Sequence, residues 1–198
     1  FLDAWVSGRL HHGWLITGPR GVGKATLAWK IARFLLATPE DANSEFGGGM
    51  FAPPPPTSLD IPADHPVVRR TAALSEGRLF LLRRGANTTG SALSAEIRVD
   101  EVRAMKSFFT LSAADGGRRV AIIDSADEMT VGATNSLLKL LEEPPAGVTL
   151  LLISHQPFRL LPTIRSRCRE LRVGTLPPDL MAEALVAAGA EVSPDEVQ

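Results

Sequence analysis

The stretch that decides the fold reads Gly18-Pro19-Arg20-Gly21-Val22-Gly23-Lys24, and Ala25 and Thr26 follow it. Its spacing is G-x-x-x-x-G-K, in which the glycines let backbone N–H groups turn inward around an anionic phosphate and the lysine neutralises the outer phosphates. A short apolar run over residues 12–17 precedes the loop, and an amphipathic pattern over residues 24–37 follows it. A chance glycine turn would lack these flanks, so the sequence predicts a phosphate-binding loop between a strand and a helix.

Apolar runs and amphipathic segments alternate along the rest of the chain. The sequence predicts strands over 12–17, 78–83, 119–124, 148–154 and 170–173. It predicts helices over 1–9, 24–37, 97–112 and 130–143, a short turn or helix over 160–166, and a new helical unit from residue 177. This alternation predicts a three-layer α/β domain with a mostly parallel sheet over residues 1–175, followed by a second unit over 176–198. In such folds the glycine loop lies at the carboxyl edge of the sheet, where ligands bind.

Composition narrows the class of protein. The chain has 198 residues, 44% of them hydrophobic and 22% charged, with a formal net charge of -1. These values are ordinary for a globular protein and give no global basic field that would attract nucleic acid. Scattered charges usually form a solvated face. The basic side chains considered for contact with phosphate are Arg103, Lys106, Arg118 and Arg119.

The sequence has no second cysteine, no membrane-spanning stretch and no signal-peptide pattern, and these facts limit the cellular compartment and the metal sites that we expect. Cys168 is the one cysteine, which excludes an intrachain disulfide and a cysteine-built zinc cage. No apolar stretch reaches the roughly 18 uncharged residues that span a bilayer, and no signal-peptide pattern is present. We therefore expect a cytoplasmic chain without membrane contact. The sequence begins at Phe1 within a helical pattern, so we expect terminal pieces to lie outside it.

The segment over residues 38–66 differs from the rest in composition. It contains Gly47-Gly48-Gly49 and Pro53-Pro54-Pro55-Pro56 and has little periodicity. Such a segment buries little apolar surface. The sequence predicts an exposed insertion here, and a loop without a function of its own is the simplest interpretation.

The residue after the loop lysine departs from the phosphate-loop motif. Ser or Thr normally stands there, because its hydroxyl holds Mg²⁺, whereas this chain has Ala25. Thr26 comes one residue later and points about 100° further round the helix, so it is a poor substitute. Phosphate can bind through Lys24 and the loop, but a metal ion would be held less well.

A second departure follows the predicted strand over 119–124. That strand ends in Asp124, as in a Walker B motif, where the acid faces the metal; the alternative is that Asp124 caps the next helix. Many hydrolytic proteins place a glutamate next, which positions the attacking water, and this chain has Ser125 there. A hydroxyl cannot act as a carboxylate base near neutral pH. Asp127 and Glu128 are acids, but they lie one turn further on.

A third candidate is the tripeptide Ser166-Arg167-Cys168. An arginine held in a tight turn can reach across an interface and stabilise charge on a neighbour's nucleotide during phosphoryl transfer. A lone arginine more often forms a surface ion pair, and Cys168 is more often a small buried side chain than a nucleophile. No metal-site spacing joins the histidines, for which we expect surface or packing roles: His11, His12, His65 and His155.

Four segments together resemble the clamp-loader branch of the AAA+ family: residues 12–24, Asp124, residues 135–145 (NSLLKLLEEPP) and residues 166–168 (SRC). The resemblance covers about residues 1–175 and implies a P-loop NTPase-like AAA+ domain. It implies ATP or ADP with Mg²⁺ as ligands of the loop, although the intact phosphate cradle and the missing metal hydroxyl leave open whether nucleotide is bound. The residues that the resemblance places at the nucleotide are Gly18, Pro19, Gly21, Val22, Gly23, Lys24, Ala25, Thr26 and Asp124.

The resemblance also implies a role. Ala25 and Ser125 match clamp-loader subunits that do not hydrolyse ATP, whereas the motor subunits gamma and tau carry Ser or Thr at the first position and Glu at the second. Arg167 would be an arginine finger that acts in trans on a motor subunit. The remaining chain would be a rigid stator in a hetero-pentamer with gamma/tau and delta subunits. That assembly loads the sliding clamp onto primed DNA.

Further expectations follow from the resemblance. Clamp-loader subunits often carry a four-cysteine zinc module after the phosphate-loop helix, and the cysteine-free insertion over 38–66 stands in its place, so we predict no zinc. Residues 176–198 would begin a helical lid, with a collar domain beyond this chain. Two other interpretations stay open: a gamma/tau-type motor subunit in which Asp127 or Glu128 supplies the carboxylate, and a regulator that uses the core for protein contacts alone.

Overall fold

The structure, a computed structural model, describes residues 1–38, 54–86, 92–111 and 117–187. Its centre is a five-stranded sheet in the order β2-β3-β4-β1-β5, and every neighbouring pair is parallel. The strands are β1 (Gly13–Thr17), β2 (Leu79–Arg83), β3 (Arg119–Asp124), β4 (Val148–Ser154) and β5 (Arg169–Arg172). The predicted α/β fold with a mostly parallel sheet is therefore confirmed.

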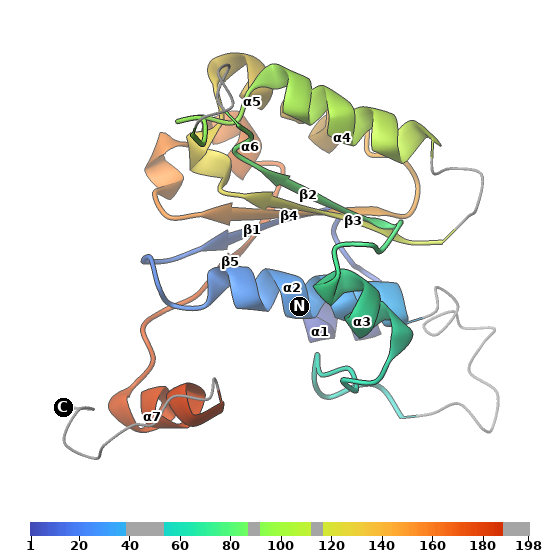
Figure 1. Cartoon of the computed structure of the whole chain (residues 1–198), viewed down its shortest axis with the longest axis vertical. Coiled ribbons are helices and arrows are strands. Elements are labelled where there is room, and N and C mark those ends of the chain that lie inside the picture. The colour runs from blue at the N-terminus through green and yellow to red at the C-terminus, as the bar shows by residue number, and fades with distance from the viewer. Residues whose placement is uncertain (39–53, 87–91, 112–116, 188–198) are drawn as a thin grey trace.

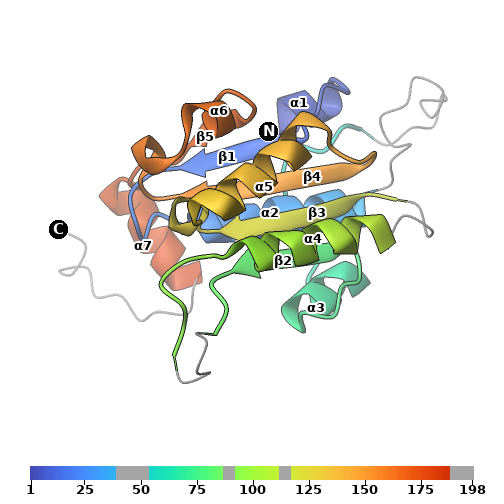
Figure 2. The same ribbon diagram turned by 90° about the horizontal axis from the view of Figure 1, so that it is seen from above.

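Helices cover both faces of the sheet and make the three layers (Figures 1 and 2). One face carries α1 (Leu2–Val6), α2 (Lys24–Ala37) and α3 (Pro66–Ala72). The other face carries α4 (Val99–Leu111), α5 (Val131–Glu142) and α6 (Pro162–Arg165). Two 3-10 turns, η3 (Ala126–Glu128) and η4 (Pro157–Arg159), follow β3 and β4. The last helix that the structure describes, α7 (Pro178–Ala187), stands apart from the sheet in Figure 1.

The central strands are buried on both sides, which explains their continuous apolar runs. Successive residues of β3 alternate between the two layers: Val120 and Ile122 pack with α1 and α2, and Ala121 and Ile123 pack with α4 and α5. Five of the six residues of β3 are buried, and the last, Asp124, is half-buried. The sheet therefore divides the interior into two cores and leaves its two edges, the carboxyl and the amino ends of the strands, for polar chemistry.

Element bounds agree closely with the sequence where the pattern is strong. The strands over 119–124 and 148–154 and the helix over 24–37 have the predicted limits. Helix α3 was not predicted. Its start is set by His65, whose Nδ1 accepts the Val67 N–H at 3.2 Å, with Pro66 in the first turn. Seven residues carry too short a periodic signal beside a proline-rich segment.

The described end of the insertion, residues 54–65, contains no helix or strand and is mostly exposed, as expected. It is nevertheless attached to the domain: Leu59 and Ile61 pack against the core on the α2 side, and Asp60 pairs with Lys30 of α2 at 2.8 Å. The triple-glycine stretch and Pro53 lie outside the described residues.

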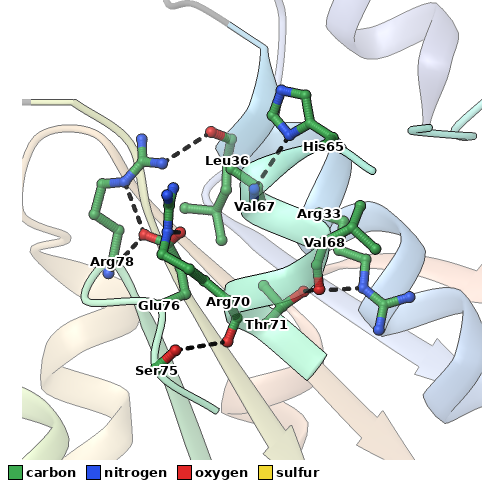
Figure 3. Close-up of polar contacts among 10 residues, drawn as sticks. All are labelled: Arg33, Leu36, His65, Val67, Val68, Arg70, Thr71, Ser75, Glu76 and Arg78. Atoms are coloured by element: carbon green, nitrogen blue, oxygen red, sulfur yellow. Dashed lines mark hydrogen bonds and ion pairs between the residues drawn. The ribbon is translucent and has the colours of Figure 1, made fainter. Parts of the chain in front are cut away.

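A buried carboxylate ties the chain after the insertion to the rest of the domain (Figure 3). The Glu76 side chain is 4% exposed and accepts hydrogen bonds from Arg70 Nε at 2.7 Å and Arg78 Nε at 3.1 Å. Arg78 Nη2 also donates to the Leu36 carbonyl at 3.1 Å, near the end of α2. Burial by itself would raise the pKa of Glu76, but the hydrogen bonds and charges of the two arginines outweigh it and hold the pKa below its ordinary value.

We predict that Glu76→Gln lowers the free energy of unfolding by about 1–3 kcal/mol at pH 7, because charge-assisted hydrogen bonds are lost while the shape is kept. The folded pKa lies below the unfolded one, so this stabilisation is present above about pH 4.3 and is lost as the pH falls through the folded pKa. Urea unfolding of both proteins across pH 3–7 measures it. We expect their difference to shrink at low pH, and a constant difference would contradict the prediction. Glu143→Gln, at an exposed carboxylate, is the control.

Candidate functional site

The glycine loop joins β1 to α2 at the carboxyl edge of the sheet. Gly23 has φ 85°, which turns the chain into α2 at Lys24. Gly18 has φ 147°, and a Cβ there would lie 2.1 Å from the Val173 carbonyl oxygen. Only glycine fits at this point, because the segment after β5 packs directly on the loop. The predicted strand, loop and helix are therefore present, with Pro19 and Gly21 exposed and Val22 half-buried.

The loop lysine is turned into the loop. Lys24 is 3% exposed, and its Nζ donates hydrogen bonds to the carbonyl oxygens of Gly18, at 2.8 Å, and of Pro19. Burial is the main cause that lowers the pKa of Lys24, and the charges of Asp127 and Asp124 oppose it. A phosphate bound here would have to replace these carbonyls as the partner of the ammonium group.

A cavity of about 700 Å³ opens beside the loop, over the carboxyl ends of β2 and β3. Asp124 reaches it with a half-buried side chain, but Ser125 is only 3% exposed. Asp127 Oδ1 accepts the backbone N–H of His155 at 3.0 Å. Glu128 lies between two arginines, at 3.0 Å from Arg84 and 3.8 Å from Arg20 of the loop. Both acids that could replace the missing glutamate are thus engaged in structural contacts.

His155, for which a surface or packing role was expected, lies at the carboxyl edge of the sheet beside the loop. It follows β4 and lines both the first cavity and a second one of about 420 Å³ on the β5 side of the loop. Its Nδ1 is buried, with no hydrogen-bond partner within the described part of the chain. Burial, followed by the charge of Lys24, lowers the pKa of His155, which favours the neutral form of the ring.

The sequence could have indicated His155 and two arginines that were missed, Arg20 and Arg84. Arg84 comes directly after β2 and His155 directly after β4, and the carboxyl ends of parallel strands meet at one edge of the sheet. The other histidines agree with packing roles: His12 Nε2 contacts the Leu141 carbonyl at 2.9 Å, and His65 caps α3.

The loop region fits a phosphate chain better than it fits magnesium. The close approach at Gly18, the α2 N-terminus and the Lys24 ammonium group together suit an anion. A metal ion would find Asp124 but no hydroxyl from Ala25, and Thr26 is exposed on α2. Among the residues that the structure describes, no group of three or more His, Cys, Asp or Glu side chains is arranged to hold a metal ion.

Arg167 lies at the opposite edge of the sheet. Gly13 begins β1, and a Cβ on Gly13 would lie 3.2 Å from the Arg167 carbonyl oxygen, whereas the glycine loop follows the other end of β1. Five residues of strand separate the ends by about 13 Å. An arginine side chain extends roughly 7 Å from its Cα by standard bond lengths. Arg167 therefore does not reach the phosphate loop of its own chain.

The Arg167 guanidinium group is ordered by two acceptors. Its Nη2 pairs with Glu142 Oε1 at 2.9 Å, and its Nη1 donates to the Thr163 carbonyl at 3.1 Å. The side chain remains 36% exposed. The backbone beneath it is anchored by Ile164, which is fully buried. The result is a guanidinium group held at the surface rather than a free side chain.

Two basic candidates differ from a solvated face. Arg119 is 6% exposed and donates to the carbonyls of Phe109 and Ala146, so it fixes the end of α4 and is not available to phosphate. Arg118 lies over the Trp5 ring, 6.0 Å from its centroid. Arg103 is exposed and pairs with Asp100. None of the described helices is long and apolar enough to cross a membrane.

The fold and the loop together define an AAA+-type P-loop domain: a parallel five-stranded sheet, a glycine loop after β1 and an acid at the end of β3. A gamma subunit-related protein from Thermotoga maritima has the same fold, with a TM-score of 0.60, 20% sequence identity, and 92% of this chain and 49% of that chain covered.

Residues 67–177 match the protein family described as DNA polymerase III, delta subunit. Subunit delta' of Pseudomonas aeruginosa DNA polymerase III is 38% identical over 157 residues, which are 79% of this chain and 41% of that protein. Subunit delta' of Escherichia coli is 31% identical over 192 residues, 97% of this chain and 51% of that protein. The gamma/tau subunit of Mycobacterium tuberculosis is 30% identical over 188 residues, 93% of this chain and 27% of that protein. The chain belongs to this family of DNA polymerase III clamp-loader subunits, and it spans about half the length, or less, of these relatives.

The thiol of Cys168, next to Arg167 in the sequence, is expected to react slowly. Burial raises the pKa of Cys168 to about 12, so only about one thiol in ten thousand is ionised at pH 8. We predict slow alkylation of the native chain by iodoacetamide at pH 8 and rapid alkylation in urea, read by mass spectrometry. Rapid labelling of the native chain would contradict the prediction that burial keeps the thiol protonated.

Proposed function

We propose that this chain is the AAA+ part of a delta-prime-type subunit of a bacterial DNA polymerase III clamp loader. In this proposal the subunit is a stator that does not hydrolyse ATP. It supplies Arg167 in trans to the ATP site of a neighbouring gamma/tau-type motor subunit while the sliding clamp is loaded onto primed DNA. Its partners are gamma/tau and delta subunits in a hetero-pentamer, and α7 begins the helical lid.

The distance between the two edges of the sheet is the observation that supports a role for Arg167 in trans. Arg167 is held by Thr163 and Glu142 at the amino edge, about one strand length from its own glycine loop. A guanidinium group that stabilises phosphoryl transfer must reach the transferred phosphate directly. This position supports the proposal that Arg167 serves a nucleotide on another subunit.

The contacts of the acids support the stator role. Positioning of the attacking water requires a carboxylate within hydrogen-bond reach of it. In this chain Ser125 is buried, Asp127 accepts a backbone N–H, and Glu128 is paired with Arg20 and Arg84. Lys24 and the glycines retain a phosphate cradle, which serves binding without hydrolysis.

The gamma/tau-type motor subunit is the second candidate. The similarity to the Mycobacterium tuberculosis gamma/tau subunit over 93% of this chain favours it, together with the retained Lys24. In a motor subunit Asp127 or Glu128 would have to leave its present partner and orient water. Hydrolysis by this chain's own site separates the two candidates.

We predict that Arg167→Ala lowers clamp-dependent ATP turnover by the reconstituted complex about tenfold or more, because arginine fingers contribute strongly to phosphoryl transfer. Arg167→Lys should not restore the rate, since an ammonium group lacks the planar fork of donors. Arg159→Ala, at an exposed arginine of η4, is the matched control. Normal loading and turnover by the Arg167→Ala complex would overturn the proposed role.

We also predict that the purified chain shows no Mg²⁺-dependent ATP turnover above a Lys24→Ala control. In the complex, Glu128→Gln and Asp127→Asn should leave turnover within about twofold of the unmodified complex, because neither acid is expected to act as a base. Steady-state phosphate release measures both. Turnover by the chain that disappears in Lys24→Ala, or a complex inactivated by Glu128→Gln, would favour the motor subunit instead.

A further inference from the structure

Glu142 is a carboxylate at a place where the local structure disfavours one. It is the last residue of α5, and the carboxyl end of a helix carries partial negative charge that favours cations. The same turn holds Lys139, which follows the usual preference. Such a departure from a local preference calls for a contact elsewhere in the fold that offsets it. For Glu142 the contact is Arg167.

The contact leaves Arg167 free to bind a further anion. Glu142 Oε1 accepts from Nη2 at 2.9 Å and the Thr163 carbonyl accepts from Nη1 at 3.1 Å, so the two acceptors engage different nitrogens. A guanidinium group has five N–H donors. A bidentate carboxylate would occupy a whole edge of the fork, whereas here donors remain on a side chain that is 36% exposed.

The second acceptor, the Thr163 carbonyl, belongs to a short helix that is anchored in the core. Helix α6 has four residues, so the Thr163 carbonyl has no intrahelical partner and accepts from the Arg167 side chain and from Ser166 Oγ at 3.2 Å. Ile164 in the same turn is fully buried. The guanidinium group is thus held between the end of α5 and the end of α6, two elements packed on the same core.

We propose that Glu142 is a positioning residue for Arg167: it holds the guanidinium group in the direction from which its remaining N–H donors meet the phosphates of a neighbouring subunit's nucleotide. This inference rests on the proposed function of Arg167. A long arginine side chain loses considerable rotamer freedom when it is fixed. Fixing it in the free subunit leaves less ordering to be done at the interface, and rates depend steeply on such orientation.

The test uses the complex reconstituted with the full-length subunit, with primed DNA and clamp, and compares Glu142→Ala, Glu142→Gln, Arg167→Ala and the double variant. We expect Glu142→Ala to lower kcat for ATP about fivefold, the rate equivalent of a strong exposed ion pair, with KM unchanged. Glu142→Gln should lie between, because its amide oxygen still accepts an N–H. The double variant should be no slower than Arg167→Ala alone.

The matched control is Glu143→Gln, at the neighbouring exposed acid, whose side chain forms no hydrogen bond or ion pair with the rest of the described chain. Equal losses in Glu143→Gln and Glu142→Gln, multiplying losses in the double variant, or faster turnover in Glu142→Ala would overturn the positioning role. Faster turnover would mean that Glu142 withholds the arginine. If Arg167→Ala itself has no effect, the proposed function fails; if Arg167→Ala is slow and Glu142→Ala is normal, the positioning role alone fails.

A measurement on the free chain is independent of the assembly. Side-chain ¹⁵N relaxation of the Arg167 Nε–H group should report an ordered guanidinium group in the unmodified chain and in Glu143→Gln, and a mobile one in Glu142→Ala. Removal of a carboxylate from a helix carboxyl end relieves an unfavourable charge, so we expect the variant to fold. Unchanged order in Glu142→Ala would contradict the proposal.

Discussion

All five strands run in the same direction, and the three central strands, β1, β3 and β4, are buried on both faces, so polar side chains and functional groups gather at the two edges of the sheet. The carboxyl edge collects the glycine loop, Asp124 and His155, and the amino edge collects Arg167 with Glu142. About one strand length separates them. In the proposed function, this arrangement suits head-to-tail contact, in which the arginine edge of this chain faces the loop edge of a neighbouring motor subunit. Such heterologous contacts generate rings when the rotation closes.

At the carboxyl edge, charge is balanced within the chain. Lys24 is buried among the carbonyls of its own loop, and Glu128 is shared by Arg20 and Arg84. The loop thus keeps its shape through contacts that a catalytic site would have to exchange for phosphate and water. Ser125 and Ala25 lack the carboxylate and the well-placed hydroxyl that would compete for these partners. The glycine loop therefore keeps its shape although Ala25 and Ser125 stand at these two positions.

At the amino edge, the packing of α5 and α6 holds the Arg167 guanidinium group in one place. Buried Ile164 fixes the short helix α6, and the end of α5 brings a carboxylate beside the guanidinium group. The pair is partly exposed, so its contribution to folding stability is small. Its proposed effect is to orient the Arg167 side chain, because it restricts a flexible side chain without using all of its N–H donors. On the opposite face, the Glu76 pair shows the other use of arginine, with the carboxylate buried and the contact holding α2, α3 and β2 together.

The sequence by itself determined the layer architecture, the phosphate loop and the limits of the strongest elements, because hydrophobic periodicity and glycine spacing are local properties that the chain carries wherever it folds. It also drew attention to Arg167, Ala25 and Ser125, whose proposed roles stay predictions. Only the tertiary structure decided that Arg119 is buried, that His155 lies in the walls of two cavities, that α3 forms beyond the insertion, and that Glu142 holds Arg167. These features join residues that are distant in sequence or depend on burial, and the free energy of a charged or polar side chain is set by the partners that packing brings to it rather than by its neighbours along the chain.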